Sequence, residues 1–368
     1  MICFYLIWCF GYFGVLTWLA WHWPSKSLDS HFPKAEFPRV SVIIPFRNES
    51  RLVSSLVLAL KNIHSSVLEI LLVDDQSEDD SFEKFVQGGE EIPNLQVLKS
   101  LGIGKKAALQ TGILKAKGEV MLTTDADCTF TPGWVSEILG PFQDPKVQLV
   151  AGPVISEDSN ASFFSRFQQL EWASILLLTH YSFKTGNPLM CSGANLSFRK
   201  TAFEQVNGYA GNEMFLSGDD EFLLKKIHQV FGSEACQYRP TLKALVHTEP
   251  QVSWSELLNQ RVRWAGKWRL HRSFFHGLVT LLAFFVQLIW ISTIFLFSVG
   301  QLSLLAFAGI WLGKMLAEGF AFRKVLKSLD LSFSWISLLA TSLIHPFYVL
   351  GVGLGTIGGK FSWKGRSN

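Results

Sequence analysis

The sequence predicts an α/β domain built on a doubly wound parallel sheet, with apolar membrane-type segments at both ends of the chain. Short β-branched strands alternate with amphipathic helices from about residue 38 to 250. Each of the first three strands stops at polar or turn-forming residues. The first 24 residues, and parts of the stretch 274–357, are apolar and long enough to cross a bilayer.

The composition points to a membrane protein. Charged residues make up 17% of the 368 residues, below the roughly 25% that is usual in soluble domains, and the mean hydropathy is +0.24. Such a chain is not expected to be purely soluble, disordered or collagen-like. The net charge of +3 gives no sign of a nucleic-acid partner. Five cysteines without a CxxC pattern indicate neither a zinc site nor a disulfide framework.

The N-terminal segment, residues 1–24, is predicted to be a transmembrane helix. Ile2 to Trp23 contains no acidic residue, lysine or arginine. A cleaved signal peptide is the alternative, but no basic region precedes the apolar run and no small-x-small site follows it. Trp18, Trp21 and Trp23 gather at one end, as in an interfacial aromatic belt.

The C-terminal region is expected to have two to three spans. Phe274 to Val299 and Leu331 to Ile357 are each long enough to cross. Leu302 to Phe322 is a weaker candidate, because it carries Lys314 and Glu318 four residues apart. These two side chains can pair on one helix face inside a bundle. An interfacial helix lying along the membrane is the alternative for this segment.

Loop charges predict the orientation of the spans. Cationic residues gather near span ends in three places: Lys26, Lys34 and Arg39; Lys267, Arg269 and Arg272; and Arg323, Lys324 and Lys327. If all three groups are cytoplasmic, the middle of the chain is cytoplasmic and the last span exits again. The tail residues Lys360, Lys364 and Arg366 then lie on the opposite side, in conflict with the rule.

The middle domain reads as a βαβαβ succession. Its predicted strands and helices are Val40–Ile44, Arg51–Leu60, Leu68–Val73, Lys105–Ala116 and Val120–Thr123. This order favours a parallel sheet, in which ligands bind beyond the carboxyl ends of the strands. Polar residues follow the strands at Pro45–Glu49, Asp74–Ser77 and Asp125–Asp127.

Four carboxylates are predicted to converge at that edge, where they would repel one another without a cation. Asp125 and Asp127 alternate at a strand end, so one turn can bring both to a single point. Hard oxygen ligands of this kind suit Mg²⁺ or Mn²⁺, which in turn bind phosphates. A solvated turn is the alternative reading of this Asp-x-Asp.

The polar motifs together resemble the family 2 glycosyltransferases. They are Ser41–Glu49, Val73–Ser77, Gly104-Lys105, Asp125-Ala126-Asp127, Gly218-Asp219-Asp220 and Gln260-Arg261-Val262-Arg263-Trp264. The chain looks most like the membrane-embedded branch, which includes hyaluronan, chitin, cellulose and poly-N-acetylglucosamine synthases and ceramide glucosyltransferases. The similarity covers about residues 38–270. It implies a GT-A (Rossmann-like) domain that transfers a sugar from a nucleotide sugar, most often a UDP-sugar.

The resemblance assigns donor-side roles to several of these residues. Pro45 and Glu49 would line the nucleotide pocket, and Asp75, with Asp74 beside it, would read the base. Lys105 would face the diphosphate, although it could equally be an exposed helix lysine.

Metal and acceptor roles follow from the same resemblance. Asp125 and Asp127 would hold the divalent ion that bridges the two phosphates. The loop with Gly193 and Asn195 resembles the acceptor-side loop of these enzymes, where small residues let a sugar approach the backbone. His247 is a conceivable further metal ligand, although a structural histidine is the better reading.

Asp220 matches the family's general base, and Asp219 beside it would lie on the acceptor side. A base is needed, because an acceptor hydroxyl is a poor nucleophile until its proton is removed. The same acids can also stabilise the N-terminus of a helix, and the two roles are compatible.

Gln260, Arg263 and Trp264 lie at positions i, i+3 and i+4, so they share one helix face. Arg263 can bind phosphate with two parallel hydrogen bonds, and Trp264 can stack under a sugar. Residues 251–273 can also form an amphipathic interfacial helix on the cytoplasmic face.

The expected reaction is an inverting transfer from the nucleotide sugar to a lipid or polysaccharide acceptor at the membrane. Two alternatives stay open: a polyprenyl-phosphate sugar transferase, and a transporter with a cytosolic domain. The Gln-x-x-Arg-Trp element argues against the first, and the lack of an intramembrane chain of acids argues against the second.

Overall fold

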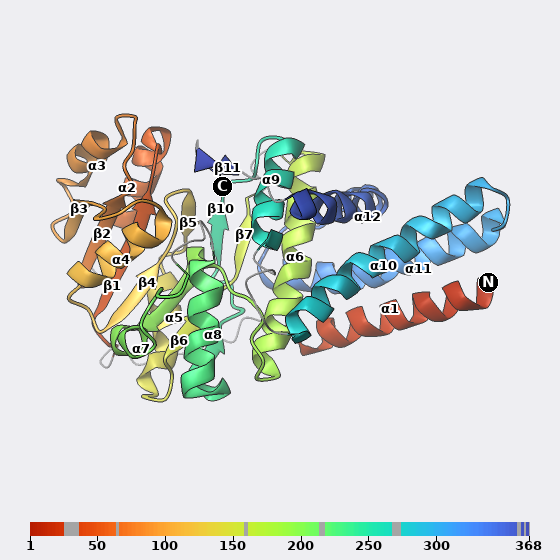
Figure 1. Cartoon of the computed structure of the whole chain (residues 1–368), viewed down its shortest axis with the longest axis horizontal. Helices are drawn as coiled ribbons and strands as arrows, with labels where there is room; N and C mark the ends of the chain where they lie inside the picture. The colour runs from red at the N-terminus through yellow and green to blue at the C-terminus, as the bar shows by residue number, and fades with distance from the viewer. Residues whose placement is uncertain are drawn as a thin grey trace. The chain divides into compact units, whose positions relative to one another are not determined.

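The computed structural model describes residues 1–25, 37–63, 66–157, 161–212, 218–266, 274–358, 362–363 and 366–367 (Figure 1). The chain forms two compact units. The sheet unit comprises residues 26–157 and 179–249. The helical unit comprises residues 1–25, 158–178 and 250–368.

The sheet unit is built on a seven-stranded sheet in the order β3-β2-β1-β4-β8-β6-β9. Its strands are β1 (Val40–Phe46), β2 (Glu69–Asp74), β3 (Leu95–Lys99), β4 (Val120–Thr123), β6 (Leu149–Ala151), β8 (Leu196–Arg199) and β9 (Cys236–Tyr238). The predicted parallel arrangement is confirmed for β2, β1 and β4, and β3, a strand not predicted from the sequence, continues it. The sheet as a whole is mixed, because β8 runs antiparallel to both β4 and β6.

A second, three-stranded sheet lies in the same unit, in the order β5-β10-β7. Its strands are β5 (Cys128–Phe130), β7 (Val154–Ser156) and β10 (Val246–Thr248). Thr248 pairs with Cys128, so β10 reaches the turn that follows β4. This sheet therefore supports the Asp125–Asp127 turn from a distant part of the chain.

The helices of the sheet unit cover a continuous apolar core. They are α2 (Val53–Lys61), α3 (Ser81–Gly89), α4 (Lys105–Lys115), α5 (Trp134–Leu139), α7 (Lys200–Gln205) and α8 (Asp219–Phe231). Ile43, Met121 and Phe198 are fully buried in this core. Helix α4 packs so closely that a Cβ on Gly112 would lie 2.5 Å from a carbon of Ile43. The long helix α6 (Phe163–Lys184) contributes residues to both units.

The helical unit contains α1 (Ile2–His22), α9 (Trp254–Ala265), α10 (Phe274–Ser298), α11 (Leu304–Ser328) and α12 (Trp335–Gly358). Among the described residues, four helices are long and apolar enough to cross a membrane, namely α1, α10, α11 and α12. The apolar segments expected at both ends of the chain are therefore helices. The weakest candidate extends to Ser328, six residues beyond its expected end.

Lys314 and Glu318 pair inside the helical unit, as their spacing predicts. The Lys314 Nζ lies 2.6 Å from Glu318 Oε1, and both residues are buried. An ion pair hidden within a bundle avoids placing either charge in lipid.

Candidate active site

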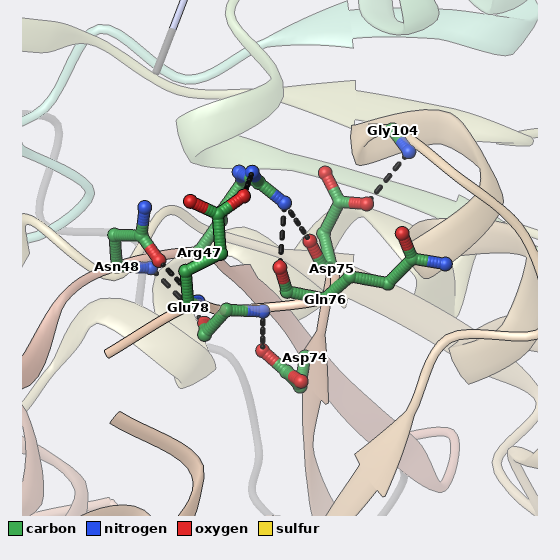
Figure 2. A network of polar contacts seen from close by, with 8 residues as sticks. Arg47, Asn48, Asp74, Asp75, Gln76, Glu78 and Gly104 are labelled. Atoms are coloured by element: carbon green, nitrogen blue, oxygen red, sulfur yellow. Dashed lines mark hydrogen bonds and ion pairs between the residues drawn. The ribbon is translucent and has the colours of Figure 1, made fainter. Parts of the chain in front are cut away.

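Two aspartates at the end of β2 hold the loops beside them (Figure 2). The Asp74 Oδ1 accepts a hydrogen bond from the backbone N–H of Ser77 at 2.9 Å. The Asp75 Oδ1 accepts one from the backbone N–H of Gly104 at 2.6 Å. Gly104 has φ +97°, a conformation that favours glycine, and α4 begins at the next residue. Asp75 therefore fixes the entry to the helix that carries Lys105.

Arg47 is a residue of this edge that sequence reasoning missed. Its buried guanidinium donates to the backbone oxygens of Asp75 (3.0 Å) and Gln76 (2.5 Å) and to the carboxylate of Glu78 (2.7 Å), as Figure 2 shows. The loop after β2 is thereby tied to the end of β1. Its sequence signal is its place within the Ser41–Glu49 motif, directly after Phe46, where that strand ends.

Pro45 and Glu49, predicted in the nucleotide pocket, flank the end of β1. Pro45 pairs with Val73 of β2 inside the sheet. Glu49 is buried, and its backbone N–H donates to the Ser81 hydroxyl at 2.7 Å. Both residues lie at the same strand end as Asp74, as the parallel arrangement requires.

Lys105 stands at the centre of an acidic cluster. Its Nζ lies 2.5 Å from Asp125 Oδ1, which joins the first residue of α4 to the turn after β4. Burial on its own lowers the pKa of Lys105, but the negative charges of Asp125, Asp219 and Asp220 outweigh it and raise that pKa above its ordinary value. Lys105 therefore remains a cation, and it is not a free surface lysine.

Asp219 and Asp220 enter the cluster from the first turn of α8. The Asp220 Oδ2 accepts from the backbone N–H of Gly193 at 3.1 Å, and its Oδ1 accepts from that of Glu221 at 2.7 Å. A Cβ on Gly193 would lie 3.1 Å from Asp219 Oδ2 and 3.7 Å from Lys105 Nζ. The backbone at Gly193 thus passes directly beside the charged groups.

Asp127 is held from the three-stranded sheet. Its Oδ2 accepts from the Thr248 hydroxyl at 3.2 Å. Among the described residues, no three His, Cys, Asp or Glu side chains gather in a way that could hold an ion. Two carboxylates, Asp125 and Asp127, on one partly exposed turn still suit a hard divalent cation whose other ligands are phosphate or water oxygens.

Asn195, predicted on the acceptor side, is fully buried in the protein. Its fully buried side chain donates to the backbone oxygens of Pro153 (2.9 Å) and Ala244 (2.7 Å) and accepts from Trp134 Nε1 (2.9 Å). The amide therefore holds the turn that carries Gly193, and its hydrogen-bonding groups are already engaged with the protein.

The remaining predicted site residues lie on α9 in the helical unit. Gln260, Arg263 and Trp264 occupy one continuous helix, as their spacing predicts. Helix α9 begins at a capped end, where the Ser253 hydroxyl accepts from the backbone N–H of Glu256 at 3.2 Å.

Arg261, within the same motif, is the second residue that sequence reasoning missed. It is buried, and its Nε and Nη2 lie 3.0 and 2.8 Å from the two carboxylate oxygens of Glu171. Its guanidinium also donates to the Gln260 side chain and lies 4.2 Å from the centre of the Trp264 ring. Arg261 therefore contacts two of the three motif side chains.

Helices α6 and α12 complete this second cluster. The Tyr348 hydroxyl donates to Glu171 Oε1 at 3.0 Å, and the Trp172 ring meets the Trp264 ring edge-on at 5.4 Å. Because Glu171 and Arg261 are ninety residues apart, no local pattern could have paired them.

Residues 41–206 match the model of glycosyl transferase family 2. A probable glycosyltransferase, YdaM, of Bacillus subtilis is 24% identical over 62% of this chain and 55% of its own length. A beta-monoglucosyldiacylglycerol synthase of Trichormus variabilis is 23% identical over 64% of this chain and 50% of its own. The chain thus matches only about half the length of these curated relatives.

The fold also has a solved counterpart. A mannosyltransferase, PcManGT, from Pyrobaculum calidifontis superposes with a TM-score of 0.57 at 18% identity, covering 97% of both chains. The segment that matches the family model contains β1, β2, β4 and the Lys105–Asp125 pair. Residues 41–206 are thus similar to glycosyl transferase family 2, and the chain has a GT-A fold.

Proposed function

We propose that the protein is a membrane-bound inverting glycosyltransferase that moves a sugar from a UDP-sugar to a hydroxyl group of a lipid or growing glycan. The observation that carries the proposal is the cluster of Lys105, Asp125, Asp219 and Asp220 around the Gly193 backbone. A cation for a leaving phosphate and a carboxylate for an acceptor proton stand side by side there.

In this mechanism Asp220 is the general base. It accepts the proton of the acceptor hydroxyl while the acceptor oxygen forms a bond to C1 of the sugar. The bond from C1 to the diphosphate oxygen breaks, and its electron pair leaves with the nucleoside diphosphate. Lys105 stabilises the negative charge that develops on that diphosphate, and Arg263 is assigned the same role. Since the acceptor attacks directly, no covalent enzyme intermediate is required.

Asp125 and Asp127 would hold Mg²⁺ or Mn²⁺ on the turn after β4. Such an ion supplies positive charge to the diphosphate as it leaves. The structural counterpart PcManGT is described in complex with GDP-Man and Mn²⁺. Thr248 keeps the Asp127 carboxylate in place for this task.

Donor recognition is assigned to the end of β1 and β2. Asp75 and Asp74 would read the base, with Pro45 and Glu49 lining the pocket. Arg47 and Gly104 support that surface by holding its loops. Gly193 and Asp219 would face the acceptor, while Asn195 holds the turn that carries Gly193.

A lipid acceptor is the form of the proposal that the chain favours. It has four helices of membrane-crossing length among its described residues, and one relative is a glucosyldiacylglycerol synthase by name. An undecaprenyl-phosphate 4-deoxy-4-formamido-L-arabinose transferase of Salmonella choleraesuis is 33% identical, but over only 27% of this chain. A polyprenyl-phosphate acceptor is therefore the second candidate. In both forms of the proposal the catalytic domain is cytoplasmic.

The proposal is tested by incubating the purified full-length protein with Mn²⁺, a panel of UDP-sugars and lipid extracts. We expect UDP release that depends on one sugar, and a glycosylated product identified by mass. A diacylglycerol product and a polyprenyl-phosphate product distinguish the two acceptor classes. If the folded protein releases no UDP from any donor, the proposal is wrong.

A further inference from the structure

Helices α10 and α11 form an antiparallel hairpin whose register the side chains define. The Phe297 and Phe307 rings stack at 4.6 Å near the turn. Further along, Trp311 Nε1 donates to the Thr293 hydroxyl at 2.9 Å. Nine residues back from Thr293 on α10 is Phe284, and eight residues on from Trp311 on α11 is Gly319. Phe284 and Gly319 therefore lie at about the same level of the hairpin.

Both ends of α12 pack at this one level. The Trp335 ring at its beginning lies directly against Gly319, where it leaves no room for a Cβ. Near its other end, a Cβ on Gly353 would lie 2.9 Å from the Phe284 ring. Trp335 and Gly353 are separated by about 27 Å of helix, at 1.5 Å per residue. If α12 ran parallel to the hairpin, Trp335 and Gly353 would lie about 27 Å apart along the hairpin axis. They lie at the same level instead, so α12 runs across the hairpin. Figure 1 shows α12 foreshortened beside α10 and α11.

The crossing is held by the buried ion pair. Pro346 lies inside α12 and has no N–H, so the backbone oxygen of Ser342 lacks its usual helix donor. Lys314 Nζ donates to that oxygen at 3.1 Å, and Glu318 accepts from the hydroxyls of Ser342 and, at 2.8 Å, of Tyr12. A lysine inside an apolar helix is costly unless such partners surround it. This one joins α11 to the proline turn of α12.

The two faces of α12 differ in what covers them. One face packs on α9 and α6: Tyr348 lies in a cluster with Phe167 and Leu257, and a Cβ on Gly355 would lie 2.6 Å from Val262. The other face is an exposed apolar stripe, comprising Ile336, Leu339, Leu343, Phe347 and Leu354. These residues recur with helical spacing, so they line one side of α12.

We propose that α12 lies within one leaflet of the membrane, with this stripe in the acyl chains, and does not cross the bilayer. The leaflet is the one in which α11 ends, because Gly319 is nine residues from that end and fifteen from the beginning of α11. Helix α1 ends on the same side, since Trp23 Nε1 donates to the Ser328 hydroxyl at 2.7 Å. Three helices, α1, α10 and α11, then cross the membrane.

This arrangement removes the conflict in the loop charges. Lys360 and Lys364 lie outside the described residues, but a chain that does not cross again after α11 carries its C-terminal charges on the side where α1 ends. The loop charges of the sequence then agree with the positive-inside rule. The inference concerns membrane topology and holds whichever sugar or acceptor the enzyme uses.

Cysteine labelling tests the topology. In a full-length background whose five natural cysteines are replaced and which still releases UDP, Ser25→Cys, Gln301→Cys and Ser367→Cys are each exposed to a membrane-impermeant maleimide in sealed vesicles of both orientations. We expect Ser25→Cys and Ser367→Cys to label from one side and Gln301→Cys from the other. Labelling of Ser367→Cys together with Gln301→Cys would overturn the proposal. A tag after Asn368, probed by added protease, asks the same question of the chain with its own cysteines.

A double-mutant cycle tests what holds the crossing. Pro346→Ala restores the N–H that can bond the Ser342 oxygen within α12. Lys314→Met should therefore lower the unfolding temperature less in the Pro346→Ala background than in the parent chain. The loss of the Lys314–Glu318 pair is common to both backgrounds and cancels. Equal losses would show that Lys314 does not support the proline turn.

Discussion

The two units each contain a lysine–carboxylate pair of almost the same length in very different surroundings. Lys105 and Asp125 lie 2.5 Å apart with 21% and 34% of their side chains exposed. Lys314 and Glu318 lie 2.6 Å apart with only 1% and 7% exposed. The first pair stands at a sheet edge open to solvent, and the second lies within a bundle of apolar helices.

Their neighbours explain what each pair can do. Asp219 and Asp220 add negative charge around Lys105, so this cluster carries more negative than positive charge. Lys314 and Glu318 balance each other, and both hold Ser342. Burial and charge balance, more than the length of the ion pair, thus distinguish the cluster that we propose as a ligand site from the pair that fixes helix packing.

The largest effect is expected from Asp220→Asn, which keeps the size of the side chain but cannot accept the acceptor proton. Removing a general base typically costs 10² to 10⁴ in rate, about 3 to 5 kcal/mol of barrier. UDP affinity is the internal control, because Asp220 is assigned to the acceptor side. Unchanged transfer would move the base to Asp219 or Glu221, and lost UDP binding would make Asp220 a donor-site residue.

Replacing each lysine by methionine tests the comparison itself. Lys314→Met leaves Glu318 buried without its partner, which should cost roughly 3–5 kcal/mol of stability. Lys105→Met should lose most transfer activity while its unfolding temperature changes little, because its ion-pair partner Asp125 reaches solvent. The measurements are thermal unfolding in detergent and UDP release. Equal destabilisation by the two variants would show that the pairs do not differ in role.

The residues at the edge of the sheet could be predicted from the sequence because each strand and its end are marked by neighbouring residues. The strands around Ile43, Leu71 and Met121 are short apolar runs that stop at polar residues, and parallel strands bring those stops together. The meeting of Lys105 with Asp125, twenty residues apart, follows from that topology.

Other features depend on contacts that no local pattern encodes. The antiparallel strand β8, with Phe198, has only four residues and no periodicity to give its direction. The burial of Asn195 is set by residues 42 to 61 positions away. The partner of Arg261 is 90 positions away, and the crossing of α12 depends on where Gly319 and Gly353 meet large rings.

Asp127→Ala should separate metal-assisted from metal-independent binding at the exposed cluster. We expect UDP affinity in Mn²⁺ to fall at least roughly tenfold, since even outer partners of metal ligands cost that much. Affinity measured in a chelator should change little. Equal weakening with and without Mn²⁺ would argue against Asp127 as a ligand.

Two arginines of α9 should fail in different ways, which extends the comparison to the helical unit. Arg263→Lys should lose most activity with unchanged stability, because an ammonium cannot reproduce the planar fork on phosphate. Arg261→Lys should lower the unfolding temperature. It should also raise the ratio of UDP released to sugar transferred, because Gln260 and Trp264 lose their support.

Asn259→Ala, an exposed change on the same helix, is the control for both and should behave like the parent chain. A proportional fall of release and transfer in Arg261→Lys would mean that Arg261 supports only the fold. Near-normal turnover in Arg263→Lys would leave α9 as a membrane-surface helix.

The smallest effect is expected at a third lysine–carboxylate pair, which is the most exposed of the three pairs compared. Lys146 and Glu234 lie 3.9 Å apart with 74% and 82% of their side chains exposed. Water and salt screen such a pair, so Lys146→Ala should change stability by no more than about 0.5 kcal/mol and leave transfer unchanged. Unfolding temperatures at low and high salt provide the measurement. If Lys146→Ala destabilised the protein as much as Lys314→Met, burial would not be the property that ranks the three pairs.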